Sequence, residues 1–496
     1  MKLQTETKLP TNAKAVVAPR YVQKSNPWQL RIGERRVVLL AGDFLVACIA
    51  LLLALYFWGS ADRFPTWGLE FIRTRPPQWF FFLPLFWMVL LIELYDVRRA
   101  GDWKKTVQGV AAAVGVGIIL YLLVYFYSAS SDLPRNQWPP RRGVAAFVAA
   151  AAGLTLGWRY LYIRIFAAAQ FMRRALLVGG GRSGESLLQV TSEIWPPPFF
   201  VVGVIDDDPQ KQGTEVHGVP VIGTSDDLMD IVKESSVTDI IVAISGPMAP
   251  QMFKALLDAQ QYGVEISRMP TVYEEVLGRV PIRLLESDWI LRSFVDENRR
   301  STFYDLVKRL MDLAGGFVGL LAFLLVYPFV ALAIILDDGR PVIYGQTRLG
   351  RGGQPYTILK FRTMCNNAEP DGKPQWAKEH DNRATRVGRF LRKTHLDELP
   401  QFINVIRGEM SLVGPRAERP ELVDYFQKHV PFYRARLLVK PGLTGWAQVN
   451  FSYASTIEET IIKLEYDLYY IKHRSLITDL IIMLRTPPTM LGFRGR

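Results

Sequence analysis

The sequence predicts three structural parts: a membrane α-helical bundle of four spans, a small parallel α/β domain, and a mainly α C-terminal domain that meets the membrane through a re-entrant helix. Hydrophobic residues make up 49% and aromatic residues 12% of the 496 residues, which is high for a soluble protein of this size. Four apolar segments come first, and a glycine-rich turn follows the last of them. We therefore expect a tail at 1–36, four helices at 37–170, the α/β domain at 171–298 and the C-terminal domain at 299–496.

The net charge of +12 indicates contact with anionic groups. No stretch joins a basic face to a recognisable nucleic-acid motif, so we expect lipid headgroups and phosphates as partners and no nucleic acid. Cys48 lies in an apolar run and Cys365 in a polar loop. Two isolated cysteines support neither a disulfide framework nor a metal-thiolate site.

The N-terminal half reads as a tail followed by membrane spans. Residues 1–36 are polar and basic and lack the apolar core of a signal peptide, so a flexible cytoplasmic tail is expected. The apolar segments 37–58, 79–95, 107–127 and 143–166 each approach the length needed to cross about 30 Å of hydrocarbon. If all four cross, most flanking basic residues share one side, which predicts a multi-pass bacterial inner (plasma) membrane protein with that side in the cytoplasm. These residues are Arg31, Arg35, Arg36, Arg98, Arg99, Lys104, Lys105, Arg173 and Arg174, whereas Arg63, Arg141 and Arg142 fall on the opposite side.

The stretch ALLVGGGRSGESLLQV, from 175 to 190, has the pattern strand, glycine turn, helix. Gly179, Gly181 and Gly184 match G-x-G-x-x-G, and the strand at 201–205 ends in Asp206, at the spacing of a ribose-binding acid. Strand-like runs at 219–222 and 239–244 complete a Rossmann-like α/β domain. Nucleotide binding at these four residues and a purely structural or homodimer-forming role both remain open.

Two adjacent carboxylates, Asp397 and Glu398, lie among basic residues just before an apolar run. Apolar residues recur every three to four positions from 399 to 406, and Pro400 suits a first helical turn, so a helix is predicted to begin near Asp397. A helix N-terminus favours an ionised carboxylate, and nearby cations could bind a phosphorylated substrate. The cations are Arg392, Lys393 and Arg416. An ordinary cap with solvated charges is the alternative.

Three long motifs together resemble one known family. THLDELPQFINVIRGEMSLVGPR at 394–416, KFRTM at 360–364 and KPGLTGWAQVN at 440–450 are similar to the bacterial sugar transferases, the large monotopic polyprenyl-phosphate phosphoglycosyl transferases. The resemblance covers about the last two hundred residues. It implies an enzyme that moves a sugar-1-phosphate from a UDP-sugar to undecaprenyl phosphate, releases UMP and starts an exopolysaccharide or glycan.

The same resemblance implies roles for individual residues. Asp397 corresponds to the nucleophile that forms a covalent phosphosugar intermediate, and Glu398 to a glutamate tied to Mg²⁺, with Asp397 as a second possible ligand. Arg416 corresponds to the arginine of the family's Gly-Pro-Arg-Pro motif, in which Ala417 replaces the second proline. Lys360 and Arg362 follow a strand-like run at 356–359 and are expected to contact phosphate, with a solvated basic edge as the alternative.

The segment 308–336 is predicted to enter the membrane and return. Its uncharged run from Leu313 to Leu336 is 24 residues long, enough to cross the bilayer as a helix. A crossing would place Asp397 away from cytosolic UDP-sugars, and Pro328 supplies a point at which the helix can bend. A kinked full span is the alternative, and hydropathy alone prefers it.

Two other functions compete with this interpretation. Membrane-anchored nucleotide-sugar dehydratases or epimerases also join membrane helices to a Rossmann domain and use a tyrosine and a lysine four residues apart, as Tyr304 and Lys308 are. A non-catalytic scaffold of a polysaccharide export complex is the third hypothesis.

Gly442 and Gly445 are expected to place Trp446 and Gln448 near the site, although a buried tryptophan more often packs than recognises substrate.

Overall fold

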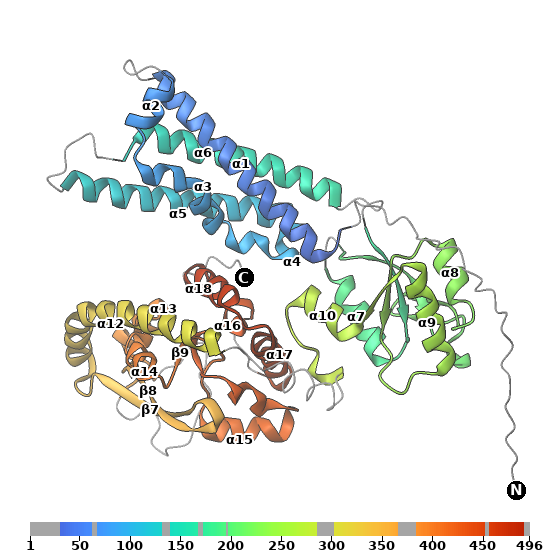
Figure 1. The fold of residues 1–496 in the computed structure, drawn as a ribbon. Coiled ribbons are helices and arrows are strands. Elements are labelled where there is room, and N and C mark those ends of the chain that lie inside the picture. Colours follow the sequence, from blue (N-terminus) through green and yellow to red (C-terminus); the bar gives the residue numbers. More distant parts are fainter. Residues whose placement is uncertain are drawn as a thin grey trace, which may run out of the picture.

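The computed structural model describes residues 30–61, 67–130, 139–166, 172–194, 197–284, 302–365, 383–451 and 456–490. Most of the predicted tail, residues 1–29, lies outside these ranges. The described chain forms a helical bundle, an α/β domain next to one end of the bundle, and a C-terminal domain beneath it (Figure 1). This is the order of parts that the sequence predicts.

Three long helices form the frame of the bundle: α1 (Ile32–Ala61), α5 (Trp103–Ser130) and α6 (Arg141–Phe166). Each is long and apolar enough to cross a membrane. The short helices α2 (Leu69–Thr74) and α4 (Val97–Ala100) lie in the connections. Small buried residues of α1, among them Ala47, Ala50 and Ala54, let α6 approach closely.

The second predicted span differs from a continuous helix. The chain there forms η1 (Gln78–Phe82), α3 (Leu83–Leu90) and η2 (Ile92–Tyr95), and Pro84 lies in the first turn of α3. The break leaves backbone carbonyls without helical donors, and fully buried Arg159 of α6 donates to the Leu94 carbonyl at 2.8 Å. Arg159 also forms a buried ion pair with Asp43 of α1 at 2.7 Å. This arginine therefore fixes the irregular second pass against α1 and α6.

The α/β domain contains one six-stranded sheet of order β3-β4-β2-β1-β5-β6, parallel except for the β3–β4 pair. Helices α7 (Arg182–Ser192) and α10 (Met269–Leu277) pack on one face, and α8 (Leu228–Glu234) and α9 (Pro250–Tyr262) on the other. The strands predicted near 201–205, 219–222 and 239–244 are confirmed. The strands are β1 (Arg174–Val178), β2 (Phe200–Ile205), β3 (Glu215–Val216), β4 (Val219–Gly223), β5 (Asp239–Val242) and β6 (Glu265–Arg268), with η5 (Pro209–Lys211) between β2 and β3.

The C-terminal domain is mainly helical and carries two small two-stranded sheets, antiparallel β7–β8 and parallel β9–β10. Its core also contains Val280 and Ile282, which precede the division predicted at residue 298. The elements are η6 (Ile282–Leu284), α12 (Thr302–Asp338), β7 (Ile343–Leu349), η8 (Arg351–Gly353), β8 (Pro355–Phe361), α13 (Arg386–Thr394), η9 (Leu396–Glu398), α14 (Gln401–Arg407), β9 (Ser411–Val413), α15 (Pro420–His429), η10 (Tyr433–Leu438), β10 (Gly442–Thr444), α16 (Trp446–Asn450), α17 (Ile457–His473) and α18 (Leu476–Met490).

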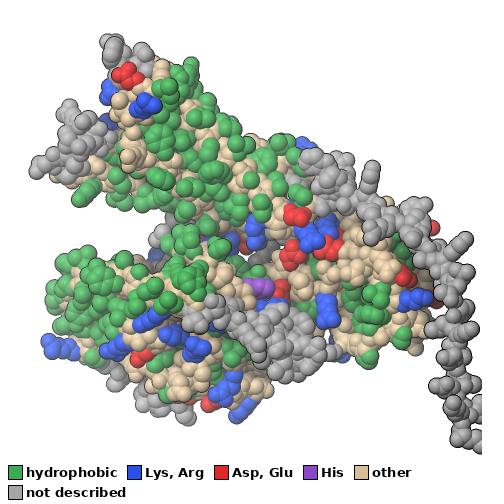
Figure 2. Space-filling view, viewed as in Figure 1, with side chains coloured by type: hydrophobic (Ala, Val, Ile, Leu, Met, Phe, Trp, Pro, Cys, Tyr) green, Lys and Arg blue, Asp and Glu red, His purple; other side chains and the backbone are tan. Residues whose placement is uncertain are grey.

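Helix α12 runs for 37 residues with Pro328 inside it, and Phe303–Asp338 is long and apolar enough to span a membrane. Both of its ends are bonded to the C-terminal domain. Arg309 donates to the Val405 and Ile406 carbonyls at 2.9 and 2.7 Å, and the Asp337 carboxylate accepts from the Val387 backbone N–H at 3.0 Å. The opposite face of α12 is apolar and exposed, and Figure 2 shows hydrophobic side chains gathered over this part of the molecule and over the bundle. The exposed residues include Phe303, Leu310, Phe317, Leu321, Leu325, Phe329, Leu332 and Leu336.

Candidate active site

Asp397 and Glu398 lie in the 3-10 turn η9, between α13 and α14. The left-handed backbone of His395 (φ 56°) ends α13 and starts this turn, and α14 begins at Gln401 with Pro400 as its N-cap. The predicted helix therefore begins four residues later than Asp397. Because Pro400 has no N–H to donate, the chain enters α14 through a tight turn that presents both carboxylates beside β8.

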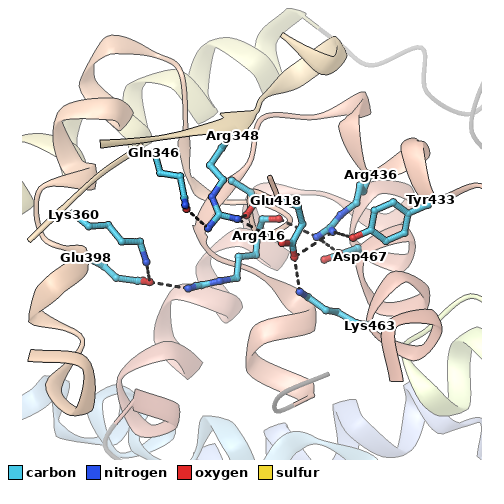
Figure 3. A network of polar contacts seen from close by, with 11 residues as sticks. Gln346, Arg348, Lys360, Glu398, Arg416, Glu418, Tyr433, Arg436, Lys463 and Asp467 are labelled. Carbon is cyan, nitrogen blue, oxygen red and sulfur yellow. Dashed lines mark hydrogen bonds and ion pairs between the residues drawn. The ribbon is translucent and has the colours of Figure 1, made fainter. Parts of the chain in front are cut away.

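Glu398 is the centre of a three-residue ion-pair cluster. Its Oε1 accepts from Lys360 Nζ of β8 at 2.7 Å and from Arg416 at 2.8 Å (Figure 3). Burial by itself would raise the pKa of Glu398, but the charges and hydrogen bonds of Arg416 and Lys360 outweigh burial and hold the pKa well below its ordinary value. Glu398 therefore remains a carboxylate at neutral pH and holds two cations at one point.

Asp397 is buried, with 8% of its surface exposed. Burial raises its pKa above the ordinary value, and the charge of Glu398 acts in the same direction. Lys360, Arg416 and Arg392 oppose this shift, which places all three cations within electrostatic reach of Asp397. A desolvated carboxylate faced by cations has the properties of a nucleophile for an electrophilic phosphorus.

The cations predicted to bind phosphate do not all meet. Lys360 and Arg416 share Glu398, and Arg392 Nε donates to Thr363 Oγ1 at 2.9 Å. Arg362 is buried and donates to the Asp338 and Gly339 carbonyls at 2.8 and 2.7 Å, which caps the C-terminal end of α12. The structure therefore gives Arg362 a place at the end of α12 rather than in the Glu398 cluster.

A second layer of charges holds the loop that carries Arg416 (Figure 3). Arg436 donates to the Arg416 carbonyl at 2.9 Å and to Asp467 at 2.9 Å, and Arg348 donates to the Ala417 carbonyl at 3.3 Å. Glu418 lies between these arginines and accepts from Lys463 at 2.9 Å. The loop backbone is therefore fixed on its inner side while the Arg416 side chain points to Glu398.

Sequence reasoning missed this second layer: Arg348, Glu418, Arg436, Lys463 and Asp467. Glu418 follows Arg416 by two positions, and an acidic residue there among basic ones was an available signal. The other four are spread over 120 residues and carry no shared pattern, so only the packing of η10, α17 and β7 around the loop brings them together.

Mg²⁺ in this site would have few protein ligands. Across the described ranges, no three His, Cys, Asp or Glu side chains gather as a metal-binding group. Asp397 and Glu398 are the adjacent carboxylates that could hold the ion. Mg²⁺ is commonly bound by one or two carboxylates and completed by water and substrate phosphates, so this pair suits a cation that arrives with a diphosphate.

The glycine turn of the α/β domain is hydrogen-bonded to the carboxylate at the end of β2. Gly179 has φ +103°, and a side chain at Gly184 would meet the Gly179 carbonyl at 2.2 Å, so both positions need glycine. A side chain at Gly181 would meet nothing within 4 Å. Asp206, at the end of β2, accepts from the Gly180 N–H at 2.7 Å and from Lys211 at 2.9 Å. The carboxylate predicted to bind a ribose is thus bonded to the turn itself.

The tyrosine and lysine of the dehydratase hypothesis lie in the C-terminal domain. Lys308 Nζ forms an ion pair with fully buried Asp479 at 2.9 Å, and the Tyr304 hydroxyl donates to the same carboxylate at 3.3 Å. Both therefore fasten α12 to α18, whereas the glycine turn belongs to the α/β domain (Figure 1). The structure therefore does not bring Tyr304 and Lys308 together with the glycine turn, as a dehydratase site would require.

Two family models match this chain, one in its C-terminal domain and one from the second half of the bundle into the α/β domain. The family model of the bacterial sugar transferases matches residues 303–492, and that of a CoA-binding domain matches residues 91–270. A UDP-N-acetylgalactosamine-undecaprenyl-phosphate N-acetylgalactosaminephosphotransferase of Aeromonas hydrophila is 40% identical over 47% of this chain and 54% of its own length. The chain thus spans about half the length of that relative.

Two further relatives cover more of their own sequences. A UDP-glucose:undecaprenyl-phosphate glucose-1-phosphate transferase of Caulobacter vibrioides is 44% identical over 38% of this chain and 70% of its own length. A protein of the same name from Escherichia coli is 29% identical over 82% of this chain and 88% of its own length. Since the matched region includes η9, the Arg416 loop and β8, the chain belongs to the bacterial sugar transferase family.

Proposed function

We propose that the protein transfers a sugar-1-phosphate from a UDP-sugar to undecaprenyl phosphate through a covalent intermediate on Asp397. The observation that carries this proposal is a buried carboxylate, Asp397, next to a second carboxylate, Glu398, whose charge is already paired with Lys360 and Arg416. The names of the relatives support the class of reaction.

The first step is a displacement at the β-phosphorus of the UDP-sugar. A carboxylate oxygen of Asp397 forms a bond to this phosphorus, the bond to the bridging oxygen breaks, and UMP leaves with the electron pair. The product is a sugar-phosphoryl aspartate. Lys360 and Arg416, which meet at Glu398 Oε1, would pair with the diphosphate oxygens.

The second step regenerates Asp397. A phosphate oxygen of undecaprenyl phosphate attacks the same phosphorus, the acyl-phosphate bond breaks, and the carboxylate is restored. The products are undecaprenyl diphosphate-sugar and the free enzyme, so each turnover needs no other reactant. Mg²⁺, held by Glu398 with Asp397 as a second ligand, would neutralise the diphosphate and stabilise the departing UMP.

The geometry of α12 supports a membrane-associated acceptor. A helix that crosses the bilayer has its ends about 30 Å apart on opposite sides. Here Arg309 near one end and Asp337 near the other are both bonded to the C-terminal domain, while the face between them is apolar and exposed. We infer that α12 enters and leaves the inner membrane on the cytoplasmic side, where UDP-sugars are made.

The test is transfer from radiolabelled UDP-glucose, UDP-galactose and their N-acetylated relatives to undecaprenyl phosphate in membranes that contain the protein. Wild type should transfer label from one of these donors and should retain labelled phosphosugar when acceptor is omitted. Asp397→Asn should lose both signals because the amide keeps the shape but is not nucleophilic. Asp424→Asn, an exposed position on α15, is the matched control and should behave as wild type.

Two results would overturn the proposal. Wild-type turnover by Asp397→Asn would exclude the covalent route. Full support of polysaccharide export by the same variant in cells would favour a scaffold instead.

A further inference from the structure

The α/β domain is fastened to the C-terminal domain by the end of α10. Glu274, with 4% of its surface exposed, forms an ion pair with Lys472 at 3.1 Å and a hydrogen bond with His473 at 2.8 Å, both at the end of α17. Six residues after Glu274, the Val280 N–H donates to the Glu465 carbonyl at 3.1 Å, and Arg279 pairs with the Glu465 side chain at 3.4 Å. A buried carboxylate that contacts both a lysine and a histidine marks a specific docking contact rather than a loose linker.

Trp446 lies in the middle of this contact. Its indole N–H donates to the Gly278 carbonyl at 2.7 Å, and its ring stacks on Tyr469 with centroids 5.7 Å apart. Gly278 ends α10 in a left-handed conformation (φ +64°), and carbonyls at a helix end need a donor from outside the helix. The tryptophan of the C-terminal domain thus supplies a bond that the α/β domain needs.

Trp446 lies two residues after the end of β10, the strand that supports the Arg416 loop. Thr444 of β10 accepts from the Gly414 N–H at 2.9 Å, and the Gly442 N–H donates to the Pro415 carbonyl at 2.9 Å. A side chain at Gly445 would meet the Gly414 carbonyl at 2.2 Å, so the two backbones are in direct contact. Both residues before Arg416 are therefore bonded to the segment that ends at Trp446.

We propose that Trp446 is a positioning residue through which the docked α/β domain sets the place of Arg416. Its indole bond to Gly278 anchors the segment 442–446, that segment holds the backbone of 414–415, and Arg416 is thereby held beside Glu398. The inference rests on the proposed function for what Arg416 does, but it assigns the α/β domain a role that needs no bound nucleotide.

The test compares Trp446→Phe with Glu274→Gln and with the double variant in the full-length protein. Phenylalanine keeps the stack on Tyr469 and removes the bond to Gly278, whereas Glu274→Gln weakens docking from the other domain without touching the transferase motif. Loss of one such hydrogen bond should raise KM for the UDP-sugar by about five- to tenfold with kcat nearly unchanged, because Arg416 binds the diphosphate throughout the reaction. Trp103→Phe, an exposed position on α5, is the matched control.

The double variant separates positioning from general damage. If both changes act through one docking contact, its KM should equal the larger single effect, whereas independent effects would multiply. Unchanged KM in Trp446→Phe, or multiplying effects, would overturn the proposal. If Trp446→Phe does not fold, the KM of Glu274→Gln alone decides, since it must rise. An inactive wild type would instead refute the proposed function, so the two failures are distinguishable.

Discussion

Replacing Glu418 by glutamine should destabilise the C-terminal domain strongly. Glu418 has Lys463 at 2.9 Å and Arg436 and Arg348 at 3.6 Å, with 15% of its side chain exposed. Burial alone would raise its pKa, but Lys463, Arg436 and Arg348 together lower the pKa from 4.5 to about 2. That difference corresponds to about 3 kcal/mol of unfolding free energy at neutral pH. Removing one partner of a buried charge network costs a similar amount, about 3–5 kcal/mol.

The sign of the pH dependence follows from the lowered pKa. Because the folded pKa lies below the unfolded one, the stabilisation is complete above pH 4.5 and is lost as the pH falls towards 2. For a domain of about two hundred residues, 3 kcal/mol corresponds to a decrease in Tm of about 6–12 °C. Tryptophan fluorescence of the detergent-solubilised protein should show this decrease equally at pH 7.5 and pH 5.5. Glu421→Gln, on the exposed first turn of α15, is the control, and a decrease below about 2 °C for Glu418→Gln would refute the reasoning.

Three further predictions concern the site, the domain division and the membrane topology. Glu398→Gln should lower kcat about ten- to a hundredfold and shift the Mg²⁺ titration of the rate to higher concentration, whereas an unchanged Mg²⁺ profile would exclude Glu398 as a ligand. A truncated protein of residues 278–496 should retain transferase activity and a higher Tm than residues 302–496, because Val280 and Ile282 are buried in the C-terminal core; equal Tm values would contradict their role. The topology test uses Asp305→Cys and Arg340→Cys, each in a protein with Cys48 and Cys365 replaced by serine. Both introduced cysteines should react with an impermeant thiol reagent only after spheroplasts are opened. Labelling of position 340 in intact spheroplasts would show that α12 crosses the membrane.

The candidate site was partly predictable because its charges are local in sequence. Asp397 and Glu398 are neighbours, and the motif at 394–416 places Arg416 within one loop and helix of them. A strand at 356–359 was also predicted, and β8 confirms it and extends through Lys360. The position of Arg362 was not predictable. In a regular strand, side chains alternate, so Lys360 and Arg362 would lie on one face. β8 instead ends at Phe361, and the Arg362 guanidinium bonds to the end of α12.

Composition and periodicity by themselves determined the apolar segments, the parallel α/β domain and the acidic pair, because each depends on residues close together in the chain. Tertiary structure decided how the two neighbouring carboxylates differ in pKa. Asp397 and Glu398 are chemically similar neighbours, yet burial raises the pKa of Asp397, while Lys360 and Arg416 lower that of Glu398. Tertiary structure also placed Val280 and Ile282 in the core of the C-terminal domain and Trp446 at the docking contact of two domains. Charge and hydrogen-bond energies depend on distance in space. Residues 278 and 446 are far apart in the sequence, and no local sequence pattern indicates that they are in contact.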